Sequence, residues 1–206
     1  MSGLYSQIQN LVIIYKDFLP KLWGFTGVLL ARYFPAWFQG EIGHTLLFFF
    51  AFNLVTTLLS LPVSYYNTFV LEEKFGFNKQ TLKIWVSDLI KGQLLSIVLG
   101  GPIMAAVLKI IQKTGNEFFY YLWIFSIVVQ VFMITIYPIV ILPLFNKLSP
   151  LEPGPIKTGV EELAQKLNFP LHEIYSIDGS KRSAHSNAYF YGLPWKKHIV
   201  IYDTLI

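Results

Sequence analysis

The sequence contains no cysteine and little charge, and each shortage excludes a class of protein. Without cysteine, disulfide scaffolds and thiolate metal sites are excluded. Charged residues make up 14% of the 206 residues and hydrophobic residues 54%, so an ordinary soluble core could not enclose the apolar side chains. The net charge of +4 is mild, which favours a membrane protein with basic loops over a nucleic-acid-binding protein.

The short motifs of self-sufficient enzymes are also missing. There is no G-x-S-x-G and no P-loop. His172-Glu173 begins like the zinc motif H-E-x-x-H, but Ser176 stands at the fifth position and the segment is predicted to be a strand. Glu41 and His44 in "EIGHT" again lack the second histidine. A zinc site assembled from the four scattered histidines stays an alternative without the usual ligand spacing.

Apolar segments dominate the first 145 residues, which we interpret as a membrane domain with four spans. A helical span needs roughly 20 mostly apolar residues. The predicted spans are 22–38, which Arg32 interrupts, 45–63, 94–111 and 118–145. Before them, an amphipathic segment is predicted to lie against the membrane or other helices through Leu11, Ile14, Tyr15 and Phe18.

Lysine and arginine are distributed unevenly between the links. The loop 64–93 carries four lysines and the segment after residue 145 carries seven basic residues, whereas the link 39–44 has none. By the positive-inside rule, the amino end, the loop 64–93 and the segment after 145 are predicted to be cytosolic.

The later spans contain helix-breaking and polar residues. Gly100-Gly101-Pro102, Pro138 and Pro143 are expected to kink the helices, because proline removes a backbone hydrogen bond. Polar side chains at or within the spans favour hydrogen bonds between helices, and a wet cavity between bent helices is the alternative. These side chains are Asn53, Gln93, Ser126 and Gln130.

Residues 146–206 differ in composition and read as the start of a small α/β module. "NKLSPLEPGP" is interpreted as a linker, and an amphipathic helix follows that ends before Pro170. Its apolar face is predicted from Ile156, Val160, Leu163 and Leu167. "HEIYSIDG" is predicted to be a strand, and "SNAYFYG" and "KHIVIYD" a β-hairpin joined by "LPWK".

Two segments have more than one interpretation. Glu72, Glu73 and Lys74 are typical of a solvated surface, although the four nearby aromatic residues would also suit a docking or substrate-lining role. In "HSNAYFYG", alternation places Tyr189 and Tyr191 on one face and Phe190 on the other. This strand is either a half-buried strand or an edge strand that receives an extended peptide.

At these residues the sequence resembles a known family. "GSKRSAHSNAYFYG" followed by "HIVIYDTLI" is similar to the type I CAAX prenyl proteases, with further similarity in "LEEKFGFNKQT" and "LPLFNKLSPLEPG". The resemblance implies a mainly α fold: a multi-pass membrane bundle, part of a seven-helix chamber, followed by the start of an α/β metallopeptidase module with a β-hairpin. It also implies a zinc endopeptidase of the endoplasmic reticulum, and in some members of the inner nuclear membrane.

The resemblance assigns roles to particular residues. Asn187, Ala188 and Tyr189 are expected to pair with the backbone of a prenylated CAAX substrate, and His185 and Arg182 to lie near the entrance of its cleft. The loop "EEKFGFN" matches one that the family retains, without an assigned chemical role.

The resemblance implies that H-E-x-x-H and a further glutamate ligand lie beyond Ile206, so the sequence is interpreted as part of a longer protein that binds zinc there. We therefore assign no catalytic residue and no metal ligand within residues 1–206, and expect neither bound zinc nor activity from this chain alone. The expected partners are the prenylated substrate and the lipid bilayer, with no nucleic acid. A non-catalytic membrane scaffold or lipid-binding protein is the alternative. A transporter has little support, because Asp88 and Glu117 flank spans and do not lie inside them.

Overall fold

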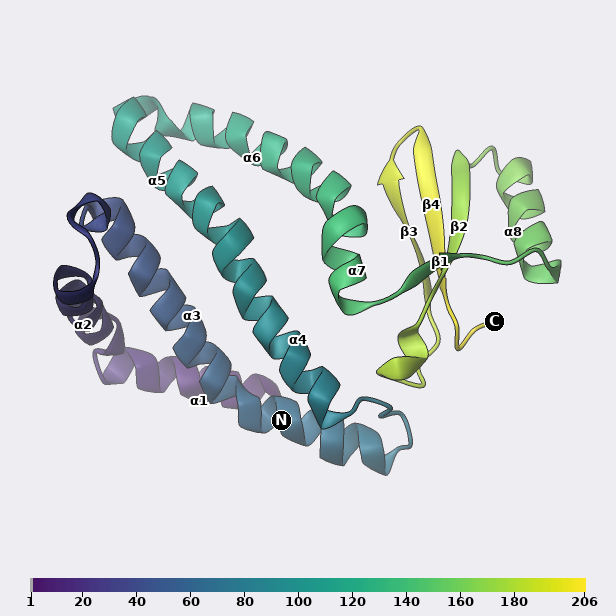
Figure 1. The fold of residues 1–206 in the computed structure, drawn as a ribbon, viewed down its shortest axis with the longest axis horizontal. Coiled ribbons are helices and arrows are strands. Elements are labelled where there is room, and N and C mark those ends of the chain that lie inside the picture. The colour runs from purple at the N-terminus through teal and green to yellow at the C-terminus, as the bar shows by residue number, and fades with distance from the viewer. Residues whose placement is uncertain (1) are drawn as a thin grey trace. The chain divides into compact units, whose positions relative to one another are not determined.

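The computed structural model describes residues 2–206, and in this range the chain forms eight α-helices and four β-strands (Figure 1). The chain divides into two compact units. The first contains the residues up to Asn67 together with Gly92–Leu122, and the second contains Thr68–Lys91 together with Trp123–Ile206. Each unit is described by itself.

The first unit is helical. It contains α1 (Ser2–Tyr15), α2 (Phe18–Tyr33), α3 (Glu41–Tyr66), the end of α4 (Leu82–Leu95) and α5 (Gly101–Thr114). Helices α2 and α3 meet at a buried polar contact: the Thr26 side chain is fully buried, and its hydroxyl lies 3.2 Å from Nε2 of His44. The same Nε2 lies 2.9 Å from the carbonyl oxygen of Trp23. His44 therefore has a structural role in fastening α2 to α3.

Helix α2 ends earlier than the predicted span 22–38. Its last residue is Tyr33, and Phe34 has an extended backbone with φ −106° and ψ 148°. Proline follows at position 35 and disfavours helical backbone in the residue before it. In α1, Leu11, Ile14 and Tyr15 are exposed while Ile13 is buried, so the predicted apolar stripe does not pack on protein.

Two helical runs of the described chain are long and apolar enough to cross a membrane, Glu41–Glu72 and Leu82–Phe145. The first contains the predicted span 45–63. The second contains the predicted spans 94–111 and 118–145, with a tight turn, Gly115–Glu117, between α5 and α6 (Phe118–Ile136). Almost none of the side chains in these runs are buried by protein, which fits helices whose apolar surface is covered by lipid.

The predicted interruptions appear as local widening of the helices. π-Helical segments lie at Ser96–Gly100, just before Pro102, and at Tyr137–Ile141, which contains Pro138. A proline has no N–H to donate, and a wider π-turn accommodates the missing hydrogen bond without ending the helix. Pro143 lies in the short helix α7 (Leu142–Phe145) that continues this run.

Polar side chains join the helices of the first unit, as predicted for Gln93. Its side-chain amide donates to the hydroxyl of Thr57, linking α4 to α3 at 2.8 Å. Gln112 donates to Glu41 at 2.7 Å and links α5 to α3. Ser126, in contrast, donates to the carbonyl of Trp123 within its own helix.

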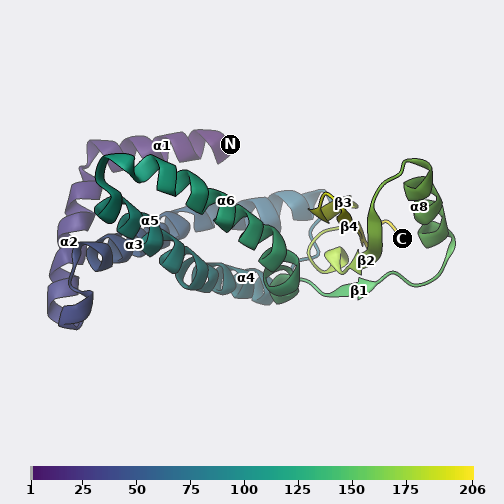
Figure 2. The ribbon, with the colours of Figure 1, turned by 90° about the horizontal axis from the view of Figure 1, so that it is seen from above.

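The second unit is built on a mixed four-stranded sheet in the order β1-β2-β4-β3 (Figures 1 and 2). Its strands are β1 (Leu148–Pro150), β2 (Leu171–Ile177), β3 (Ala188–Leu193) and β4 (Lys196–Tyr202). β1 and β2 are antiparallel, β2 and β4 are parallel, and β3 and β4 form the predicted hairpin.

Each face of the sheet has its own hydrophobic cluster. Leu142 of α7 packs with Ile177 and Val200 on one face. Leu151, Ile174 and Ile201 pack on the other face. Helix α8 (Pro155–Lys166) lies beside β2 in both views of the ribbon (Figures 1 and 2) and adds Val160 to the second cluster.

Two details of the predicted module are wrong. The segment interpreted as a linker contains β1, which pairs with β2 and ends at Pro150, a position where an edge strand tolerates proline. The buried stripe of α8 contains Val160 and Ala164, while Leu163 and Leu167 are 56% and 69% exposed. The apolar face therefore lies one residue away from the predicted one. The fold class itself is confirmed: a mainly helical, membrane-type part precedes a small α/β module that contains the hairpin.

Candidate substrate-binding site

Strand β3 forms one edge of the sheet. The Tyr202 N–H donates to the Asn187 carbonyl at 3.0 Å, which makes Asn187 a hydrogen-bonded position opposite β4. Because this pattern alternates in antiparallel strands, Tyr189 and Tyr191 also direct their backbone groups toward β4. The N–H and C=O groups of Ala188 and Phe190 therefore point to the open edge, where an extended peptide could pair.

Asn187 occupies part of this edge with its own side chain. Its Oδ1 accepts the Ala188 N–H at 2.8 Å, while its backbone carbonyl is engaged by β4. An incoming peptide would displace this local contact to reach Ala188, whereas Phe190 presents its backbone directly. Of the residues predicted to pair with substrate, Ala188 thus faces the edge through its backbone, and Asn187 reaches it through its side chain.

The loop 72–80 holds the segment that leads into β3. Lys79 N–H donates to the Arg182 carbonyl at 3.1 Å, and Ala184 N–H donates to the Phe77 carbonyl at 2.8 Å. Asn78 and Ser183 form an isolated antiparallel bridge between these contacts. The sequence alone was compatible with either a solvated surface or a docking role for this loop. In the structure, the loop supports residues 182–184 through strand-like backbone hydrogen bonds.

Arg182 fixes the same segment through its side chain. Its guanidinium donates to both carboxylate oxygens of Asp88 at 2.9 and 3.1 Å, and to the carbonyl of Phe145 at 2.6 Å. The two charged side chains are 23% and 20% exposed, so the pair is largely withdrawn from water. Asp88 belongs to α4 and Phe145 ends α7, so one arginine joins three parts of the second unit.

His185 lies on the surface between these supports and β3. Its ring stacks on Phe77 with centroids 4.1 Å apart, and its carbonyl accepts the Thr204 hydroxyl at 3.2 Å. Ser186 donates to the Thr204 carbonyl at 3.0 Å. The structure thus brings Arg182, His185 and Asn187 along one continuous segment that enters the edge strand.

The hairpin turn depends on Gly192. This residue has φ +115°, a conformation that other residues rarely adopt, and a Cβ atom here would collide with the Lys196 carbonyl oxygen. The glycine therefore permits the close approach of β3 to β4 just before the turn.

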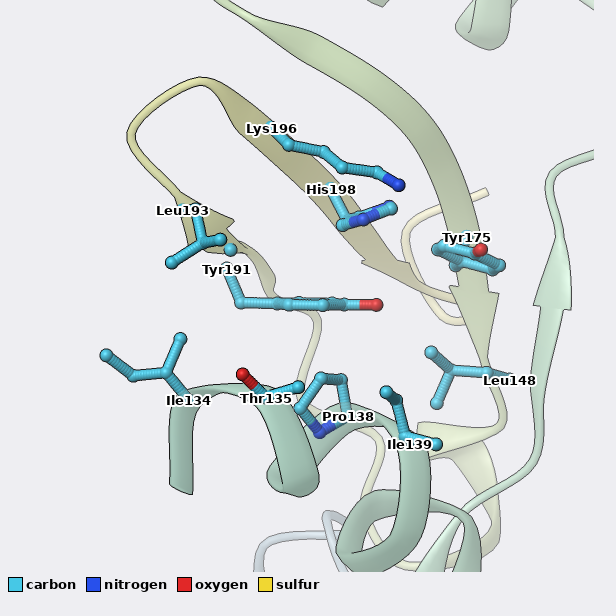
Figure 3. Close-up of a pocket in the computed structure, with 11 residues that line it drawn as sticks. Ile134, Thr135, Pro138, Ile139, Leu148, Tyr175, Tyr191, Leu193, Lys196 and His198 are labelled. Atoms are coloured by element: carbon cyan, nitrogen blue, oxygen red, sulfur yellow. The ribbon is translucent and has the colours of Figure 1, made fainter. Parts of the chain in front are cut away.

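A cavity of about 340 Å³ lies between the inner face of the hairpin and the helical run of α6 and Tyr137–Ile141 (Figure 3). Ile134, Pro138 and Ile139 form its helical wall. Figure 3 shows the Tyr191 ring lying between this wall and His198. The Tyr191 and His198 rings are stacked, with centroids 5.1 Å apart and an interplanar angle of 21°.

Burial shifts the pKa values of the aromatic groups in this cavity in the direction that favours their uncharged forms. Burial, together with the hydrogen bond from its hydroxyl to Glu173 (2.9 Å), raises the pKa of Tyr175 to about 12. Burial also raises the pKa of Tyr191. The pKa of His198 is lowered, first by burial and then by the neighbouring His172. At neutral pH these groups add no net charge to the cavity wall.

The described residues offer no metal centre. Across residues 2–206 no cluster of three or more His, Cys, Asp or Glu side chains could hold a metal ion. His172 and Glu173 lie in β2, not on a helix, as predicted for the incomplete zinc motif. We therefore assign no metal ligand and derive no chemical step through a metal in this chain.

Two known sequence families together match almost the whole chain. A sequence model described as "CAAX prenyl protease N-terminal, five membrane helices" matches residues 1–147, and one described as "Peptidase family M48" matches residues 150–206. The chain belongs to the CAAX prenyl protease family. This assignment confirms the resemblance read from the sequence.

Individual members of the family match over almost the whole chain. CAAX prenyl protease 1 of Saccharomyces cerevisiae is 46% identical over 206 residues, which cover 98% of this chain and 46% of the yeast protein. The human homolog is 42% identical over 207 residues, covering 100% of this chain and 43% of the human protein.

A solved structure agrees with these matches. The crystal structure of S. mikatae Ste24p matches with a TM-score of 0.90 and 47% identity, covering 99% of this chain and 47% of that chain. The chain thus spans about half the length of the relatives it matches.

The sequence did not single out Asp88, Phe145 or the backbone of Phe190. Asp88 was noted only as a residue that flanks a span, although a carboxylate at such a place commonly has a cationic partner. No sequence pattern indicates that the backbone carbonyl of Phe145 accepts a hydrogen bond from Arg182. The direction of the Phe190 backbone depends on which strand neighbours β3, and that neighbour is set by the fold.

Proposed function

We propose that this chain is part of a membrane zinc metalloendopeptidase that removes the C-terminal tripeptide from prenylated CAAX proteins. The observation that carries the proposal is the open edge of β3, whose Ala188 and Phe190 backbone groups point away from the sheet in a member of this family. Backbone pairing of this kind accepts an extended peptide of varied sequence, which suits a protease that acts on many substrates.

The residues of the site have distinct roles in this proposal. Ala188 and Phe190 pair with the substrate backbone. Before substrate binds, the Asn187 side chain accepts the hydrogen bond from the Ala188 N–H. Tyr189 lies on the inner face and supports the strand from below. Arg182 and His185 hold the segment at the entrance through Asp88 and Phe77. A second cut in a pheromone or lamin precursor would use the same edge.

The long apolar helices supply the wall of a membrane chamber in this proposal. In this proposal the site faces the cytosol from the endoplasmic reticulum membrane, with the inner nuclear membrane as an additional location. This orientation follows from the basic residues of the loop 64–93 and of the segment after residue 145. The zinc and its ligands belong to the full-length protein outside residues 1–206.

The decisive experiment uses the purified full-length protein and a farnesylated CAAX peptide. We expect release of the C-terminal tripeptide, detected by mass spectrometry, with loss of activity on chelation and recovery on adding zinc. The same peptide with a D-residue at the scissile bond is the matched control. Absence of tripeptide release by the zinc-loaded protein would refute the proposed function.

A further inference from the structure

A second cavity, of about 470 Å³, meets the first at strand β3. It lies between the helical run and the hairpin, with Met133 and Tyr137 on one side and Phe190 and Lys197 on the other. Both cavities are lined by Ile134, Pro138, Tyr191 and Gly192. The open edge of β3 and the space beneath the sheet are therefore neighbouring parts of one apolar region.

The first cavity has the character of a lipid-chain pocket. Its volume of about 340 Å³ falls within the roughly 300–1,000 Å³ of small-molecule sites. Ile134, Pro138 and Ile139 face Leu148 and the tyrosine rings across it (Figure 3). Its cationic residue, Lys196, is exposed, and Figure 3 shows that its side chain lies on the side of the cavity away from Ile134 and Ile139.

Strand geometry connects this pocket to the edge. Side chains alternate between the two faces of a sheet, and a paired peptide continues that alternation. Tyr189 and Tyr191 lie on the inner face of β3, whereas Phe190 is 59% exposed on the other. Every second side chain of a peptide bound at the edge would therefore enter the inner side, next to Tyr191.

The π-helical segment forms the wall opposite that position. Tyr137–Ile141 widens the helix at Pro138, and Pro138 and Ile139 lie beneath the Tyr191 ring (Figure 3). A long apolar side chain entering beside Tyr191 would contact this wall along its length.

We propose that this cavity holds the isoprenoid chain on the cysteine of a CAAX peptide whose backbone pairs with β3. The proposal rests on the proposed function and adds to it a binding site for the lipid. It predicts that the lining of the cavity sets which isoprenoid length is accepted, because a hydrophobic pocket discriminates by the chain that fills it.

The test uses the full-length, zinc-loaded protein and three peptides of one sequence that carry geranyl, farnesyl or geranylgeranyl on cysteine. Ile139→Trp fills the cavity, and we expect it to lower kcat/KM for the two longer chains at least about tenfold more than for geranyl. Ile139→Ala enlarges the cavity and shifts preference toward geranylgeranyl. Val140→Trp, at the neighbouring position outside both linings, is the matched control and leaves the ratios unchanged.

The possible outcomes separate the pocket from the proposed function. If the unmodified protein releases no tripeptide from any of the peptides, the proposed function fails. If it is active and Ile139→Trp reduces all three rates by the same factor, or changes none, the pocket is refuted while the function stands. The alanine variant retains a small apolar residue at this exposed position, so the length preference can be read even if the tryptophan variant folds poorly.

Discussion

Arg182 and Asp88 form a two-point ion pair between residues 94 positions apart, with nitrogen–oxygen distances of 2.9 and 3.1 Å. A third hydrogen bond from the same guanidinium reaches the carbonyl of Phe145. Arginine suits this position because its planar head can meet a carboxylate with two parallel hydrogen bonds while a further N–H bonds elsewhere. The pair fixes the start of the segment that becomes the edge strand.

Replacing Arg182 with leucine should destabilise the second unit, because Asp88 would be left largely buried without its partner. The expected loss is roughly 2 kcal/mol, typical of a hydrogen bond to a charged group. Thermal unfolding of the full-length protein in detergent measures it. Lys181→Ala is the control, because it removes the neighbouring ion pair between Lys181 and Asp178. The Lys181 side chain is 58% exposed, so this change should lower the free energy of unfolding only slightly. Equal losses in the two variants would contradict the structural role of Arg182.

Phe190→Pro should weaken peptide binding without unfolding the hairpin. Proline removes the Phe190 N–H, which points to the open edge and is not used in pairing with β4. We expect KM for a CAAX peptide to rise up to about tenfold, corresponding to one lost hydrogen bond.

Two controls accompany this change. Phe190→Ala removes the side chain and keeps the N–H, so its KM should stay closer to that of the unmodified protein. Tyr189→Pro removes a backbone bond to β4 and should lower the unfolding temperature instead. A normal KM for Phe190→Pro would argue against pairing at this edge.

Gly192→Ala should destabilise the hairpin. The residue has φ +115°, and the added Cβ would collide with the Lys196 carbonyl. Backbone strain of this kind costs roughly 1–3 kcal/mol. Gly159→Ala is the opposite control, because this glycine lies in α8 with open space around it and alanine favours helices by about 1 kcal/mol. Unfolding midpoints should therefore move in opposite directions for the two variants.

His198 should make the second unit less stable in mild acid. Its pKa is lowered from 6.5, mainly by burial and also by His172 and Lys196, while Glu173 acts in the opposite direction. A group with a lowered pKa binds fewer protons when folded than when unfolded, so stability rises with pH in this range. The stability that neutral His198 contributes is fully present above its pKa in the unfolded chain, about 6.5. This stability is lost as the pH falls through the pKa of His198 in the folded protein.

His198→Phe preserves an aromatic ring against Tyr191 and removes the titration. We expect the unfolding temperature of this variant to change less than that of the unmodified protein between neutral pH and the acid side of the His198 transition. His185→Phe is the control, because His185 is exposed and stacked on Phe77 outside this cluster. An unchanged slope in His198→Phe would exclude His198 as the source of the acid sensitivity.

Local patterns in the sequence predicted much of this protein. Runs of apolar residues predicted the long helices, the prolines at 102 and 138 marked the places where the helix widens, and alternation predicted the β3–β4 hairpin. These features depend on neighbours within a few residues, so composition and period reveal them. The face of α8 was missed by one residue because packing against Leu151 and Ile174, and not hydrophobicity alone, selects which side is buried.

Only the tertiary structure decided which groups form the site. The parallel pairing of β2 with β4 leaves β3 at the edge, and that position determines that Ala188 and Phe190 present their backbones. Asp88 meets Arg182, and Ile139 faces Tyr191, because segments distant in the chain fold together. The sequence thus determined the helices and strands. Long-range packing determined which strand has a free edge, which residues support it and which cavity lies beside it. Contacts between distant segments produce no local periodicity in the sequence, so the sequence could not predict them.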